Sequence, residues 1–422
     1  MIRIGTLLFL FVALLAKATF AQNDTLKIDL AQAESLFLKQ NFDLLASNYQ
    51  IDQAKAEIIT AKLFDNPELE YENIFYNHET KKFLQTSYEY GQFAGSISQL
   101  IKLASKRNKN IKLAQIGVKM AEMEYFDLMR TLRFELQTTF YKAYFSAQSL
   151  HAYDEQIQAT ESLLSAYSVQ LKMGNVALKD VIRIKSLIIG IKTERANLLN
   201  DLEDNYRDLR LLCGLKVSSN LSLMINATNN QLPLNSIPYT KLLDSAKHNR
   251  SDLKLAKVGL EYNELNLKLQ KAMAIPDVEI SLSYDLKGNY PEKYTGLGLK
   301  IPIPLFNRNQ GEIKKAKIGI DAATSNIKKQ EFLLENEVFN AYRTAIRNEK
   351  LLAEIDPSFN EDFNKLINAL IKNFRERNIS LIEFLDLYGS YKENICQINN
   401  LQFERMNSRA ELNYVTGANL FR

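Results

Sequence analysis

The chain has 422 residues, of which 46% are hydrophobic and 24% charged, and its 53 basic side chains outnumber the 49 acidic ones by only four. A net charge this close to zero gives no electrostatic basis for binding nucleic acid. The two cysteines, Cys213 and Cys396, and the three histidines lie far apart without metal-ligand spacing, so we expect unpaired buried thiols and no metal site.

The N-terminal segment has the features of an export signal. Arg3 supplies a positive start, residues 7–16 are apolar, and Thr19-Phe20-Ala21 fits the small-residue cleavage pattern. We predict a signal peptide at residues 1–21 with no lipoprotein cysteine after it; an N-terminal anchor helix is the alternative. No later segment offers about 18 consecutive apolar residues, so no transmembrane helix is predicted in the mature chain.

Helices are predicted over most of the mature chain. Residues 104–172 contain no proline and one glycine, and apolar residues recur there at steps of three and four. This pattern predicts a helix about 100 Å long at 1.5 Å per residue. Such a helix must pack along partner helices, in a coiled coil or a tunnel. The other predicted helices cover residues 29–63, 176–213, 251–272, 308–377 and 379–416.

Two segments that precede the long helices have the period of β-strands. Val278, Ile280 and Leu282 alternate with polar residues, and the alternation resumes at 294–301 after a turn at 288–291. The first half has a less regular equivalent, so we predict β-hairpins at about residues 68–99 and 277–302. Strands of this length, apolar on one face and polar on the other, are typical of transmembrane β-barrels. A soluble antiparallel sheet that covers a helix is the open alternative.

These features occur twice in the same order, about 202 to 209 residues apart. Residues 66–70, Asn-Pro-Glu-Leu-Glu, correspond to 275–279, Ile-Pro-Asp-Val-Glu, and Gly214 corresponds to Gly417. The sequence therefore predicts two copies of one unit. The repeats cover 22–214 and 241–422, their helical hairpins cover about 104–213 and 308–416, and a linker rich in Asn, Ser and Pro covers 215–240.

Four strands cannot close a barrel, which needs about eight to bury its edges. We therefore expect an oligomer, and a trimer would supply 12 strands, an even number as in single-chain bacterial barrels. The predicted fold class is mainly α with a small β part. It comprises a long α-helical coiled-coil barrel and four strands per chain that contribute to a trimeric 12-stranded transmembrane β-barrel.

The strand-to-helix junction at residues 301–313 has the sequence Ile-Pro-Ile-Pro-Leu-Phe-Asn-Arg-Asn-Gln-Gly-Glu-Ile. Together with the signal peptide and the duplicated hairpins, it resembles the TolC-type outer-membrane efflux proteins, most nearly their cobalt-zinc-cadmium resistance branch. The resemblance covers essentially the whole mature chain. It implies a homotrimer in outer-membrane lipid, with a helical tunnel in the periplasm. It also implies a periplasmic adaptor and an inner-membrane pump, of the RND type, as partners.

The resemblance further implies where such a channel closes. Glu383 and Asp386 match the family's two carboxylates shortly after the helical turn, although the first is Asp in the family pattern and Ile379 replaces a basic residue. Residues three apart share a helix face, so a trimer would carry two stacked rings of three carboxylates that attract cations. Asp180 is the first-half counterpart. The alternative is an ordinary solvated pair, favoured by the helix dipole at a helix start.

The turns at Gly174-Asn175 and Arg377-Asn378 are the predicted tips of the helical hairpins. We expect them to contact the adaptor; the plainer interpretation is that they only stop the helices.

Neither catalysis nor a cofactor is indicated, because the sequence has no glycine-rich phosphate loop and no nucleophile elbow. We predict a passive export duct for metal cations or small toxic compounds rather than an enzyme. The outer-membrane pore of a type I protein secretion system is one alternative. A periplasmic adaptor, a binding protein without a channel, is an alternative of another class.

Overall fold

The computed structural model describes residues 25–225, 233–288, 291–356, 359–376 and 378–421, so the predicted signal peptide lies outside the described residues. The chain divides into two compact units. The sheet unit comprises Asp43–Met129 and Ala246–Asn336, and the helix unit comprises the segments up to Phe42, Arg130–Ser245 and Glu337–Arg422. None of the described helices combines the length and the apolar composition needed to cross a membrane.

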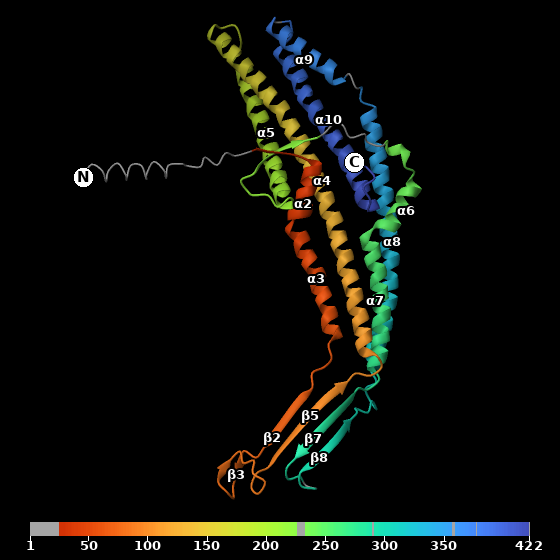
Figure 1. The fold of residues 1–422 in the computed structure, drawn as a ribbon. Coiled ribbons are helices and arrows are strands. Elements are labelled where there is room, and N and C mark those ends of the chain that lie inside the picture. The colour runs from red at the N-terminus through yellow and green to blue at the C-terminus, as the bar shows by residue number, and fades with distance from the viewer. Residues whose placement is uncertain (1–24, 226–232, 289–290, 357–358, 377, 422) are drawn as a thin grey trace, which may run out of the picture. The chain divides into compact units, whose positions relative to one another are not determined.

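The sheet unit contains one four-stranded antiparallel sheet in the order β2-β5-β7-β8 (Figure 1). Its central strands, β5 and β7, come from different halves of the chain, so the two predicted hairpins share a single sheet, with β2 and β8 as its edges. A short ribbon of two further strands extends the first hairpin. The strands are β2 (Glu68–Asn73), β3 (Tyr76–Asn77), β4 (Lys82–Phe83), β5 (Phe93–Ile101), β7 (Val278–Asp285) and β8 (Tyr294–Lys300).

Long helices complete the sheet unit: α3 (Phe42–Lys62), α7 (Ser251–Met273) and the first parts of α4 (Lys106–Lys172) and α8 (Gln310–Ala353). The two halves make equivalent bonds where strand passes into helix. Arg107 Nε donates to the Lys62 carbonyl at 2.8 Å, and Asn309 Nδ2 donates to the Gln270 carbonyl at 2.8 Å. In each half, therefore, the start of the long helix is tied to the end of the helix that opens that half.

A buried lysine joins the two halves at the same level. The Lys106 side chain is 5% exposed, and its Nζ donates to Asp277 Oδ1 and to the Ile275 carbonyl, both at 2.7 Å. Asp277 Oδ1 also accepts from the Leu103 amide at 2.8 Å. A buried charge is tolerated only when it is paired and hydrogen-bonded, and this arrangement meets that condition.

The helix unit consists mainly of antiparallel helices. Along α4 and α10, Arg130 donates to the Tyr414 carbonyl at 2.9 Å, Thr138 bonds Asn407 at 2.7 Å, and Asn399 bonds Ser149 at 3.1 Å. The elements are β1 (Thr25–Asp29), α2 (Leu30–Gln40), α5 (Leu178–Leu212), β6 (Asn220–Met224), η1 (Leu234–Ser236), α9 (Phe359–Arg375), α10 (Leu381–Thr416), the start of α6 (Tyr239–Asn249) and the remainders of α4 and α8.

Two helices predicted as continuous are interrupted, so those predictions are wrong. The predicted helix 308–377 consists of α8, which ends at Ala353, and α9, which starts at Phe359. Pro357 lies between them in the sequence, and proline disfavours helix both at its own position and at the residue before it. The predicted helix 29–63 is broken at Asn41, which has φ −66° and ψ 123°, and whose side chain donates to the Leu212 carbonyl at 3.0 Å.

The segment predicted as the linker between repeats contains regular structure. Strand β6 lies within it and pairs in parallel with β1, from Thr25 opposite Asn220 to Asp29 opposite Met224. Helix α6 begins at Tyr239, before the predicted end of the linker. The start of the described chain is thus hydrogen-bonded to the segment between the two repeats.

Glycine ends the last helix of each half in the left-handed conformation. Gly214 follows α5 with φ +64°, and Gly417 follows α10 with φ +65°. After α5, the Leu215 amide donates to the Arg210 carbonyl at 2.8 Å, a Schellman closure. A Cβ added at Gly214 would lie 2.6 Å from the Gln40 carbonyl oxygen, so this position requires glycine on both counts.

We predict that Gly214→Ala lowers the free energy of unfolding by about 1–3 kcal/mol, because the new Cβ meets both a strained φ and a backbone oxygen. The matched control is Gly190→Ala within α5, where an added Cβ has nothing within 4 Å. The control should gain up to about 1 kcal/mol from lower backbone entropy in the unfolded chain. Denaturant unfolding followed by circular dichroism at 222 nm measures both; equal effects would contradict the prediction.

Candidate functional site

The register of the four-stranded sheet separates apolar from polar side chains. Leu69 lies opposite Ile97, Ile97 opposite Leu282, and Leu282 opposite Leu297, which makes one apolar row across all four strands. These side chains are 81%, 49%, 55% and 76% exposed. Within the described residues of the single chain, no other part of the protein covers this apolar row. Exposed apolar rows of this kind indicate an interaction surface.

The opposite face of the sheet is polar. Its rows are Glu68-Ser98-Ser281-Gly298 and Glu70-Ser96-Ser283-Gly296. With Glu72, three exposed carboxylates follow one another along the edge strand β2 on this face. One face of the sheet thus suits contact with hydrocarbon and the other contact with water.

Aromatic rings cross the apolar face near the ends of the strands that lead to the connecting loops. Phe93 lies 6.3 Å from Tyr71 and 5.8 Å from Tyr284, measured between ring centroids, so the three rings connect β2, β5 and β7. Rings with an apolar body and a polar tip collect where hydrocarbon meets water, as in the aromatic girdles of membrane barrels.

The predicted hairpin tips close with the same hydrogen bond. The Asn175 amide donates to the Gln170 carbonyl at 2.9 Å, and the Asn378 amide donates to the Asn373 carbonyl at 2.9 Å. Gly174, with φ +79°, and Asn175 and Asn378 are all exposed. Arg377, the fourth predicted tip residue, lies outside the described residues. The adaptor contact itself stays a prediction.

The predicted gate residues Glu383 and Asp386 are exposed and lie on one face of α10, away from the buried Leu381 and Phe384. The Glu383 amide donates to Ser380 Oγ at 3.2 Å, so Ser380 caps the helix and Glu383 is its third residue. The sequence Ser-x-x-Glu is a capping-box signature that could have indicated this structural role. A carboxylate at this position also suits the helix dipole.

Asp180, the first-half counterpart, lies in the first turn of a different helix, α5, and is half-buried. The cap position of α5 is Ala177, whose side chain makes no capping hydrogen bond. The two hairpins therefore start their second helices differently, with a capping hydroxyl only in the second half.

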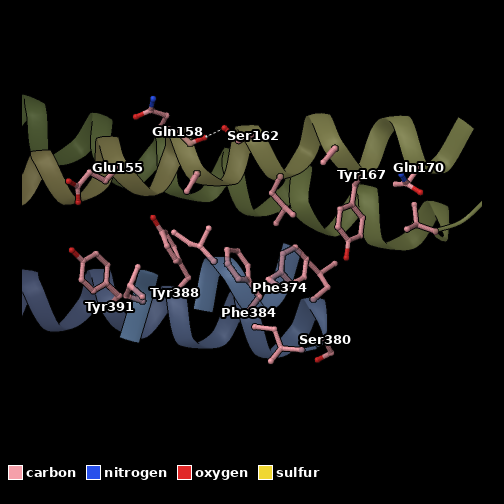
Figure 2. Close-up of a pocket in the computed structure, with 18 of the residues that line it drawn as sticks. Glu155, Gln158, Ser162, Tyr167, Gln170, Phe374, Ser380, Phe384, Tyr388 and Tyr391 are labelled. Atoms are coloured by element: carbon pink, nitrogen blue, oxygen red, sulfur yellow. Dashed lines mark hydrogen bonds between the residues drawn. The ribbon is translucent and has the colours of Figure 1, made fainter. Parts of the chain in front are cut away.

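A cleft that the sequence did not predict lies between α4, α9 and α10, with a volume of about 1280 Å³ (Figure 2). Tyr167 on α4 stacks on Phe374 of α9, with ring centroids 6.0 Å apart. Phe384 on α10 lies 4.5 Å from Phe374 and 5.5 Å from Tyr388, again between centroids. Rings some 200 residues apart in the sequence thus meet in this cleft.

The described residues contain no group of His, Cys, Asp and Glu side chains that could hold a metal ion. Cys213 and Cys396 are free thiols. Burial raises the pKa of Cys213 to about 11, so at neutral pH it is almost entirely the unreactive thiol.

Residues 34–215 match the family model of the outer membrane efflux protein. The match covers less than half of the chain and lies within the first of its two predicted repeats, so that part of the chain resembles the family. It is 22% identical over 289 residues to the cobalt-zinc-cadmium resistance protein CzcC of Cupriavidus metallidurans. That alignment covers 68% of this chain and 66% of the relative, just under two thirds of the relative's length.

Solved membrane channels share the fold of this chain. The Campylobacter jejuni CmeC channel aligns with a TM-score of 0.74 at 14% identity, covering 93% of this chain and 86% of that one. CusC aligns with a TM-score of 0.72 at 16% identity, covering 93% and 94%. The predicted fold class is confirmed: the chain is mainly α, and its main sheet has four strands.

The two helical hairpins of this chain allow a matched test of helix capping. We predict that Ser380→Ala destabilises the first turn of α10 by about 1 kcal/mol, because the Glu383 amide loses its acceptor. Ala177→Ser should stabilise α5 by a similar amount, since Ala177 already has the extended conformation of a cap residue (φ −83°, ψ 147°). Hydrogen exchange of the first-turn amides, followed by mass spectrometry, measures both. Unchanged exchange at α10 would show that the Ser380 bond contributes nothing.

Proposed function

We propose that this protein is the outer-membrane channel of a tripartite efflux system, a homotrimer through which an inner-membrane pump expels metal cations or small toxic compounds. A periplasmic adaptor would connect the channel to the pump. The observation that carries the proposal is the two-faced sheet with free edge strands, held on helices far longer than a globular domain needs. Conduction would be passive, with no catalytic step in this chain.

The dimensions of the sheet support placement in a membrane. The nine residues of β5 extend over roughly 30 Å at 3.4 Å per residue. Tilted by about 40°, they would span roughly 23 Å, close to the apolar band of about 25 Å on outer-membrane barrels. Pairing β8 of one chain with β2 of the next would satisfy both edges, and three chains would give 12 strands.

Cations are the proposed cargo because carboxylates occur at two levels of the proposed duct. Glu68, Glu70 and Glu72 lie on the polar face of β2, and Glu383 and Asp386 lie near the second hairpin tip. Rings of acidic side chains attract cations and discriminate by sign of charge rather than by chemical identity. The choice of one metal over another would therefore belong mostly to the pump.

Localisation and reconstitution together test this proposal. We expect the protein in the outer-membrane fraction as a trimer whose electrophoretic mobility changes on heating, and as a conducting pore in planar bilayers. A monomer without conductance would favour the adaptor alternative. A pore that restores protein secretion, but not metal or drug resistance, in a strain lacking its own channel would favour the secretion alternative.

Neighbouring residues on opposite faces of β7 test the membrane contact. We predict that Leu282→Arg destabilises the membrane-inserted trimer by about 2–4 kcal/mol, the cost of an arginine on the lipid face near the bilayer midplane. Ser283→Arg places the same side chain on the polar face and should leave stability nearly unchanged while weakening cation selectivity. Denaturant titration in lipid vesicles, read from the heat-modifiable band, compares the two. Equal destabilisation would contradict this orientation of the sheet.

The gate is tested by removing charge while preserving the helix start. We predict that Glu383→Gln with Asp386→Asn raises single-channel conductance and lowers the cation-to-anion permeability ratio. The expected change is about fivefold, corresponding to about 1 kcal/mol for charges some 4 Å apart in water. Glutamine can still serve in a capping box, so the fold of α10 should not change. Asp180→Asn is the control and should have a smaller effect; wild-type conductance and selectivity in the double variant would exclude these residues from the gate.

A further inference from the structure

The cleft of the helix unit has two unlike walls. Figure 2 shows Glu155, Gln158, Ser162, Tyr167 and Gln170 on the α4 side, facing Phe374 of α9 and the α10 side chains. The α4 wall therefore supplies mostly amide, hydroxyl and carboxylate groups, whereas the facing wall is apolar and aromatic. The exposed lining of the cleft is about equally polar and apolar. Small-molecule sites combine apolar and aromatic side chains with polar groups that fix the orientation of the ligand.

The aromatic wall forms a continuous row of rings. From Phe374 it runs to Phe384 at 4.5 Å, to Tyr388 at 5.5 Å, and to Tyr391 at 6.0 Å beyond Tyr388. Tyr388 is 5% exposed, whereas Tyr391 is half-buried. The row thus begins among buried apolar side chains and ends at a ring that solvent and a ligand can reach.

Glu155 supplies negative charge at the tyrosine end of this row. It is the only charged residue among the described residues that line the cleft, and its side chain is 47% exposed. His151, which lies outside the cleft and is 75% exposed, approaches Glu155 at 3.4 Å. Burial and then the Glu155 charge raise the pKa of Tyr388 to about 12 and also raise that of Tyr391, so both phenols stay neutral.

We propose that this cleft is a binding site for a lipophilic organic cation, whose charge lies between the Glu155 carboxylate and the face of Tyr391. Ring faces attract cations through their quadrupole, and the carboxylate adds a full opposite charge. The apolar groups of the ligand would contact Phe374 and Phe384. The volume of about 1280 Å³ accommodates a drug-sized molecule, and the site does not depend on the chain being a channel.

Two ions of the same shape and opposite charge test the sign of the site. Full-length protein in detergent is titrated with tetraphenylphosphonium and, separately, with tetraphenylborate by equilibrium dialysis against detergent alone. We expect saturable binding of one tetraphenylphosphonium per chain, and at least tenfold weaker binding of tetraphenylborate. Equal binding of the two ions, or no saturable binding to the wild-type protein, overturns the proposal and leaves only an unselective apolar cleft.

Matched variants locate the bound charge. Glu155→Gln should weaken tetraphenylphosphonium binding about tenfold, which corresponds to about 1.4 kcal/mol. Glu161→Gln is the control, because Glu161 lies on the same helix outside the cleft and pairs with the exposed Lys192. Tyr391→Leu should weaken binding about fivefold, and Tyr391→Phe should retain it, since the ring face and not the hydroxyl attracts the cation. Equal affinity of the two glutamine variants, or an unaffected Tyr391→Leu protein with unchanged circular dichroism, overturns the proposal.

Discussion

The antiparallel ladder between β5 and β7 is the constraint on which the rest of the sheet unit depends. It pairs Ile101 with Val278 at one end and Ala94 with Asp285 at the other, and it is the only place where strands from the two halves meet among the described strands. Side chains alternate between faces with a period of two, so a slip of one residue would move every apolar side chain of one hairpin onto the polar face. The buried Lys106–Asp277 pair lies just beyond this ladder and joins the halves where the strands pass into the helices. A charged pair of this kind is satisfied in only one alignment, which favours one register over its neighbours.

The elements with strong periodicity were predictable from the sequence, whereas only one of the two helix interruptions has a local signal. Alternation in β7 and β8 and the absence of breakers in α4 predicted a mainly α chain with four strands, because those signals are local. Pro357 is a local signal for the interruption after α8, whereas the apolar periodicity on either side of it favours one continuous helix. Asn41 differs, because neither glycine nor proline marks the break there. It ends α2 through a buried bond to the Leu212 carbonyl, a contact across 171 residues that no local pattern encodes.

The candidate sites, like the helices and strands, were predictable where neighbouring residues in the sequence form them and not where distant residues do. Glu383 and Asp386 were predicted from the family resemblance, and their local spacing places them on one helix face. The structure adds that Glu383 is the third residue after a capping serine. The capping role therefore explains why Glu383 lies near a helix start, even without a gate. Only a test of its charge can show whether Glu383 also acts in a gate. The aromatic cleft joins side chains from three helices, such as Tyr167 and Phe374, whose separation along the chain exceeds any sequence period. The residues that line the cleft could therefore be identified only from the folded structure.

The contact between the two helical hairpins is mostly apolar, and this determines how they can separate. Ile184 and Ile188 of α5 belong to the same buried cluster as Phe384 and Tyr388 of α10. Apolar contact is not directional, and its loss costs about 25 cal/mol per Å² without leaving a polar group unpaired. A buried hydrogen-bond network would instead impose the larger penalty of orphaned donors and acceptors. The ion pair between Lys392, whose side chain is 12% exposed, and Glu194, which is 52% exposed, lies farther from the tips and is not part of this apolar contact. The tips of the two helical hairpins are thus held by apolar contact, which allows the hairpins to shift by small steps. A ligand that fills the cleft would stabilise the arrangement of the hairpins that binds it more tightly.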